Sequence, residues 1–107
     1  MQKYRIAVSP LAQSDMIDIG SYIMLDLQEP ELALKILAHI EKAMQSLVQM
    51  PQRQPLLKNP RLAHIAARML AVRGYSIFYM VDEIKNEVNI YRILYRRRDW
   101  ESLLWPQ

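Results

Sequence analysis

The chain has 107 residues, and this length is typical of a single domain, which we expect to span residues 1–107. It has no cysteine, which excludes disulfides and thiolate metal sites. Its two histidines have no carboxylate cluster beside them and it has no glycine-rich phosphate loop, so we expect no metal and no cofactor. No run of about 18 apolar residues occurs, and the N-terminal residues lack the apolar core of a signal peptide. We therefore expect a cytoplasmic protein without a membrane span.

The net charge of +3 is distributed unevenly along the chain. Residues 1–50 carry four basic and six acidic side chains, whereas residues 51–107 carry ten and five. A basic half attracts phosphate backbones or an acidic protein partner. The same charges also suit an ordinary solvated surface, so charge alone does not choose between these interpretations.

The first half of the chain predicts one strand and two helices. Alternating apolar side chains predict a short strand over Tyr4–Ser9. Ser9 followed by proline is typical of a helix start, and apolar residues at steps of three and four continue to about Leu27. A second apolar stripe begins at Pro30 and ends before Pro51. Because few residues join the two helices, we expect them to pack as an antiparallel hairpin.

The second half predicts a loop followed by three strands. Residues 51–63 hold three prolines and three basic side chains, which indicate a loop. Three segments rich in Ile, Val, Tyr and Phe predict strands: His64–Val72, Tyr75–Asp82 and Val88–Tyr95. We expect an antiparallel meander with the first strand at an edge, and one or two helical turns over 97–105. The predicted fold is α+β, with a helical hairpin packed on a curved antiparallel sheet.

Arg92 is an anomaly within the last predicted strand. Strict alternation places it on the same face as Val88, Ile90 and Leu94. A guanidinium among apolar neighbours is costly unless it is paired or reaches solvent. Arg92 therefore either binds a carboxylate or strand-end carbonyls, or it orients a binding surface.

A run of arginines follows that strand. Arg96, Arg97 and Arg98 lie between Tyr95 and Trp100, and a basic patch with aromatic neighbours suits nucleic acid or an acidic helix. The alternative is that Asp99 pairs with one arginine and water solvates the others.

Two more arginines lie within the predicted strand His64–Val72 and directly after it, in the tight turn at Arg73-Gly74. Arg68 and Arg73 either add to the same face as the arginine run or serve as ordinary strand-edge charge. We expect the guanidiniums between positions 68 and 98 to gather on one side of the sheet.

The segments 68–79 and 88–99 resemble the RelE/ParE toxins, and the ParE branch most closely. The residues that carry this resemblance are Arg68, Tyr75, Ile77, Phe78, Tyr79, Ile90, Arg92, Leu94, Arg98 and Asp99, with a weaker match at Ser9, Pro10 and Ala12. The resemblance implies the toxin of a type II toxin–antitoxin pair of the plasmid-stabilisation kind, neutralised by a cognate antitoxin. Two positions depart from the pattern, because Tyr95 replaces a histidine and Arg96 replaces a glycine. Tyrosine cannot take up a proton near neutral pH as histidine can.

The resembled family contains two activities, so whether this chain is an enzyme stays open. RelE-like members cut messenger RNA on the ribosome, whereas ParE-like members inhibit DNA gyrase. Leu104 and Ala71 stand where the nuclease pattern has a tyrosine and a strand arginine, and this favours gyrase inhibition. In the nuclease alternative, Arg68, Tyr95 and Arg98 are the catalytic candidates, and a third alternative is a non-toxic relative that only binds a partner. The candidate target- or antitoxin-binding residues are Arg68, Arg73, Arg92, Tyr95, Arg96, Arg97, Arg98 and Trp100.

Overall fold

Four strands form one sheet in the order β1-β4-β3-β2, in a computed structural model that describes residues 3–60 and 64–96. The strands are β1 (Arg5–Val8), β2 (Arg68–Val72), β3 (Tyr75–Asp82) and β4 (Glu87–Tyr95). The last three are antiparallel neighbours, and β1 pairs in parallel with β4 at the edge. The predicted meander with the first strand at an edge is therefore confirmed. The β2 strand begins later than predicted, because Ala66 has a φ of 53° and interrupts the extended chain before Arg68.

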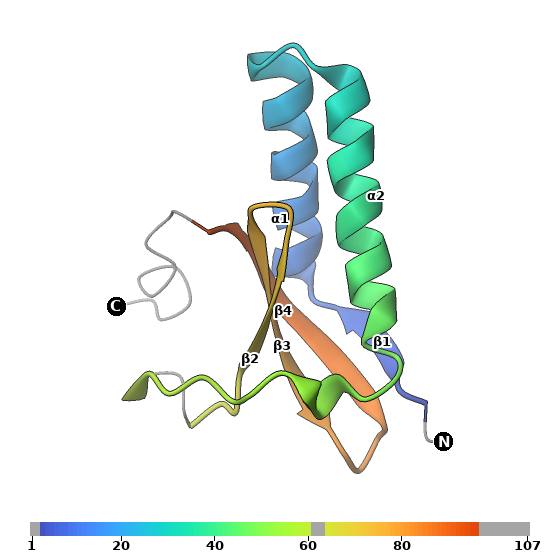
Figure 1. Cartoon of the computed structure of the whole chain (residues 1–107), viewed down its shortest axis with the longest axis vertical. Helices are drawn as coiled ribbons and strands as arrows, with labels where there is room; N and C mark the ends of the chain where they lie inside the picture. The colour runs from blue at the N-terminus through green and yellow to red at the C-terminus, as the bar shows by residue number, and fades with distance from the viewer. Residues whose placement is uncertain (1–2, 61–63, 97–107) are drawn as a thin grey trace.

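Two antiparallel helices cover one face of the sheet, and their connected ends extend beyond it (Figure 1). They are α1 (Pro10–Ser21) and α2 (Pro30–Ser46). The Ser9 hydroxyl caps α1 by accepting from the Ala12 amide at 3.0 Å, as the Ser-Pro pair predicts. The π-helical turn Tyr22–Asp26 follows α1, and there the Leu27 amide donates to the Tyr22 carbonyl. No helix among the described residues is long and apolar enough to span a membrane.

The core lies between the helices and the sheet. Its fully buried side chains include Ile40 and Leu47 from the second helix and its end, and Ile77, Tyr79, Val88 and Ile90 from the sheet. The helices approach closely at Gly20, where an added Cβ would lie 3.1 Å from Leu37 Cδ1. Leu34 of α2 is 66% exposed and does not join this core.

A β-bulge in β4 moves the side chains that follow it to the opposite face of the sheet from the one that strict alternation predicts. Phe78 pairs with Arg92 whereas Tyr79 pairs with Ile90, so Tyr91 is the extra residue. Beyond the bulge, Ile93 joins the core beneath the helices, and Leu94 packs with Phe78 in a second cluster. The prediction that Arg92 and Leu94 share a face with Val88 and Ile90 is therefore wrong, because one inserted residue shifts a period-two pattern by one position.

Hydrogen bonds hold the loop after α2 against the end of the sheet that carries the β3–β4 turn. The Tyr79 hydroxyl donates to the Pro51 carbonyl at 2.7 Å, and burial raises the pKa of this tyrosine. The Arg53 guanidinium donates to the carbonyls of Ser46 and Gln49 at 3.1 Å each, and so satisfies the C-terminal end of α2.

A second set of bonds joins three segments at the same end of the sheet. The Tyr4 hydroxyl donates to Glu83 Oε1 at 2.6 Å, and Gln52 Nε2 donates to the Tyr4 oxygen at 2.7 Å and to Glu83 Oε2 at 2.9 Å. The hydrogen bond from Tyr4 lowers the pKa of the Glu83 carboxyl, and the same bond raises the pKa of Tyr4. The polar side chains at this end of the sheet are therefore hydrogen-bonded to one another.

Candidate partner-binding groove

Helix α1 covers the edge of β4 that β1 leaves open. The β1 strand pairs with β4 only as far as Ile90, whereas β4 continues to Tyr95. Past that point the Ser9 hydroxyl donates to the Tyr91 carbonyl at 2.8 Å, and Asp15 Oδ2 accepts from the Ile93 amide at 2.9 Å. The first turns of α1 therefore satisfy edge groups that would otherwise be buried without partners.

Arg92 completes this contact as an ion pair with Asp15. Its Nε and Nη2 donate to the two carboxylate oxygens at 2.8 Å each, and the two side chains are only 16% and 9% exposed. The hydrogen bond to Asp15 raises the pKa of Arg92. Of the two interpretations of Arg92, the structure confirms that it binds a carboxylate.

Asp15 was not among the residues singled out from the sequence, although a signal for it exists. It lies three residues after Ala12 and four before Ile19, inside the stripe that faces the core. An acidic residue in such a stripe, together with an arginine in an apolar strand, indicates a buried ion pair.

Next to this ion pair, a groove of about 710 Å³ opens between the helical hairpin and the end of the sheet that carries the β2–β3 turn. Its helical side carries mainly apolar side chains, namely Ile19, Tyr22, Ile23, Leu27, Leu32 and Ile36. Its sheet side includes Arg73, Tyr75, Ile93 and Tyr95. Tyr22, Leu27, Leu32 and Tyr95 stay exposed, so the groove presents apolar and aromatic surface to solvent.

Tyrosines gather at the sheet end of the groove. The rings of Tyr75 and Tyr95 pack edge to face with centroids 5.6 Å apart. Burial raises the pKa of Tyr75, and the neighbouring Tyr95 and Tyr22 raise it further. Aromatic side chains with a polar tip are enriched where proteins bind other proteins.

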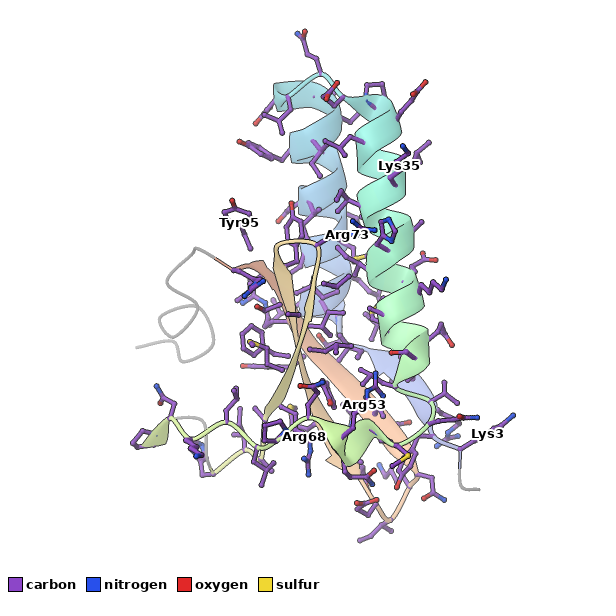
Figure 2. All side chains as sticks on the ribbon, in the orientation of Figure 1. Lys3, Lys35, Arg53, Arg68, Arg73 and Tyr95 are labelled. Carbon is purple, nitrogen blue, oxygen red and sulfur yellow. The ribbon has the colours of Figure 1, made fainter. Side chains whose placement is uncertain are left out.

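The structure does not bring all the candidate arginines together (Figure 2). Arg73 lies at the tip of the β2–β3 hairpin beside the groove, whereas Arg68 lies at the opposite end of β2. The Arg68 guanidinium donates to the loop carbonyls of Gln54 at 2.6 Å and Gln52 at 3.3 Å. The expectation that the guanidiniums gather on one side of the sheet is thus wrong for Arg68, because this side chain fastens the loop.

The candidate catalytic pair is also separated. Arg68 pairs with Tyr79 and Tyr95 pairs with Tyr75, which places them four residues apart along β3 and on the strands either side of it. From the usual strand rise and spacing, their Cα atoms are roughly 16 Å apart. Arg96 follows Tyr95, and its amide donates to the Gly74 carbonyl at 2.9 Å, so it flanks the hairpin turn. Arg97, Arg98 and Trp100 lie outside the described residues.

Comparison with known proteins identifies the family. A model described as the ParE toxin of the type II toxin–antitoxin system parDE matches residues 6–100. The chain belongs to the ParE toxin family. A comparison with curated protein sequences finds no match. In this ParE family member, Arg92 of β4 is held in the ion pair with Asp15.

Solved structures share this fold at low sequence identity. The chromosomal ParDE toxin–antitoxin system from P. aeruginosa matches with a TM-score of 0.70 and 22% identity, over 87% of this chain and 96% of that one. The toxin–antitoxin complex RelBE2 from Mycobacterium tuberculosis matches with a TM-score of 0.61 and 20% identity, over 88% and 99%. A mutant of the E. coli toxin RelE in the free state matches with a TM-score of 0.66 and 13% identity, over 97% and 95%. The predicted α+β class of the RelE/ParE toxins is confirmed.

Proposed function

We propose that this ParE family member acts in the cytoplasm by inhibiting DNA gyrase and that a cognate antitoxin neutralises it. The observation that carries the proposal is the ParE family match over residues 6–100. The geometry adds support, because the chain offers a surface suited to binding and because Arg68 and Tyr95, two of the three catalytic candidates, lie on different strands on either side of β3.

Catalysis by proton transfer requires the acid or base to lie within hydrogen-bond reach of the proton it moves. Arg68 is bound to the carbonyls of Gln52 and Gln54, on the other side of β3 from Tyr95. A Cα separation of roughly 16 Å argues against the action of both side chains on one phosphate. Inhibition by binding needs no such convergence, and it is the mechanism that we propose.

The exposed groove gives the antitoxin a place to bind. The similar structure from P. aeruginosa is a ParDE toxin–antitoxin system, and the one from M. tuberculosis is a RelBE2 toxin–antitoxin complex. We extend the pairing with an antitoxin to this chain, and we place the antitoxin segment between the helical hairpin and the β2–β3 hairpin, where the groove lies. Apolar grooves between helices and a sheet commonly take an amphipathic segment, whose buried face supplies the affinity.

Expression of the chain from a tightly controlled promoter, without a partner, tests the proposed function. We expect growth arrest, broken chromosomal DNA and induction of the SOS response, with messenger RNA left intact. Co-expression of the cognate antitoxin is the matched control and restores growth. Messages cut at defined codon positions would instead indicate a ribosome-dependent ribonuclease, and unimpaired growth would indicate a partner-binding relative without toxicity.

A further inference from the structure

The connected end of the helical hairpin presents apolar side chains to solvent. This hairpin end, residues 21–34, comprises the π-helical turn, the short connection and the start of α2, and it extends beyond the sheet (Figure 1). Three of its exposed apolar side chains lie outside the lining of the groove, namely Met24, Leu25 and Leu34. Leu25 is 68% exposed and Leu34 is 66% exposed. Exposed apolar side chains that gather in one place mark interaction sites.

The packing of the two helices brings these apolar side chains together from both. The helices approach closely where Gly20 faces Leu37. Because the helices are antiparallel, a residue four positions after Gly20 lies level with residues three or four positions before Leu37, so Met24 and Leu34 are neighbours across the hairpin. The hairpin end therefore forms one continuous apolar surface.

Backbone hydrogen bonds fix the shape of this surface. The Leu27 amide donates to the Tyr22 carbonyl at 3.1 Å, and the Glu29 amide donates to the Ile23 carbonyl at 3.0 Å. A π-helical turn interrupts the regular ladder of an α-helix, and such turns are frequent at functional sites. Because the exposed side chains are held on ordered backbone, a partner that binds them loses little free energy in ordering the chain.

The charged side chains of the hairpin end are all negative. Residues 21–34 contain three acidic residues, Asp26, Glu29 and Glu31, and no basic one. All three are exposed, and their carboxylates make no hydrogen bond or ion pair with another described residue. Residues 51–107 carry ten basic and five acidic side chains, so the hairpin end differs in sign from the second half of the chain. A basic partner surface is therefore attracted to the hairpin end.

We propose that the hairpin end binds the target of the toxin, at an apolar patch bordered by basic side chains. The proposal rests on the proposed function, in which the target is DNA gyrase, and it names the surface that contacts this enzyme. Enzymes that act on DNA carry lysine and arginine where they contact the phosphates, and unpaired carboxylates complement such a surface. The same carboxylates repel DNA itself and the hairpin end of a second copy of this chain.

The two kinds of side chain contribute to binding in different ways. Leu25 and Leu34 supply the apolar area that is removed from water in the complex, and this term sets the rate of dissociation. The carboxylates lie around the apolar surface, and charges at such positions mainly raise the rate of association and its dependence on salt. The apolar and the acidic residues can therefore be tested separately.

Binding of the full chain to purified DNA gyrase tests the apolar part. We expect Leu25→Ser to weaken binding by about tenfold and to weaken the inhibition of supercoiling to the same extent. Ile84→Ser is the matched control, because Ile84 is 96% exposed in the β3–β4 turn at the opposite end of the molecule (Figure 1). We expect this control to change binding by less than about twofold. Far-ultraviolet circular dichroism and binding to the antitoxin verify that both variants are folded.

The rate of association tests the acidic part. We expect Glu31→Gln to slow association with gyrase by about threefold and to make it less dependent on salt, with dissociation unchanged. Glu41→Gln removes an exposed charge from the middle of the same helix and is the matched control, for which we expect wild-type rates.

The outcomes separate this proposal from the proposed function. If the wild type binds gyrase and Leu25→Ser and Glu31→Gln bind it equally well, the hairpin end is refuted as the target surface and gyrase inhibition stands. If the wild type does not bind gyrase, both are refuted. Equal weakening of antitoxin binding by Leu25→Ser would refute the assignment to the target. A wild type that is dimeric in sedimentation equilibrium, with a monomeric Leu25→Ser, would refute it as well and assign the surface to a second copy.

Discussion

Replacing Asp15 by alanine removes the acceptor on which the contact between α1 and β4 depends. The carboxylate accepts from Arg92 Nε, Arg92 Nη2 and the Ile93 amide, at distances of 2.8–2.9 Å. In the variant, a guanidinium that is only 16% exposed loses its counter-charge, and a buried amide loses its partner. Breaking a buried ion pair on one side costs about 3–5 kcal/mol. The total free energy of unfolding of a chain of this length is about 5–15 kcal/mol, so the variant retains only part of its stability.

Urea unfolding followed by far-ultraviolet circular dichroism measures this loss. Asp18→Ala is the matched control, since Asp18 lies one turn further along α1 and is exposed, and we expect it to change stability by less than about 0.5 kcal/mol. The double variant Asp15→Leu with Arg92→Met removes both charges, and we expect it to be more stable than Asp15→Ala. A loss below about 1 kcal/mol in Asp15→Ala would refute the reasoning, because it would mean that Arg92 needs no partner.

Three further substitutions test separate parts of the account. Ser9→Ala removes both the cap of α1 and the bond to the Tyr91 carbonyl, and urea unfolding should show a loss of about 1–2 kcal/mol; an unchanged midpoint would contradict this role. Arg73→Asn relieves the left-handed backbone and should raise the free energy of unfolding by about 1 kcal/mol, whereas a decrease would indicate that the arginine side chain stabilises the fold. Because the bond from Tyr4 lowers the pKa of Glu83, the folded state loses this stabilisation as pH falls through that lowered pKa. The stability of the wild type should therefore fall more steeply than that of Tyr4→Phe as the pH is lowered below 4.5, and parallel curves would argue against it.

The order of elements and the helix starts follow from local sequence patterns. Ser9 and Pro10 begin α1 as predicted, because a hydroxyl cap and a proline act within one turn of the chain. Arg73-Gly74 forms the predicted tight turn for the same reason. The family pattern around β3 and β4 also predicted the sheet that carries the groove.

Features that depend on contacts between distant segments could not be predicted in the same way. The extra residue at Tyr91 is visible only in the pairing with β3, yet it decides which face Leu94 occupies. The partner of Arg92 is 77 residues away in the sequence, and the carbonyls that hold Arg68 belong to a loop without a recognisable pattern. Residue type alone therefore did not separate the arginines that stabilise the fold from Arg73, which lines the groove.

Purified DNA gyrase offers the most direct test of the central claim that this chain acts by binding its target. We expect the chain to reduce supercoiling of a relaxed plasmid and to increase the amount of cleaved DNA trapped with gyrase, and we expect added antitoxin to reverse both effects. When the same preparation of the chain is added to translating ribosomes, we expect the messenger RNA to stay intact. Unimpaired supercoiling together with cut messages would contradict the account and assign the toxin to the ribonuclease class.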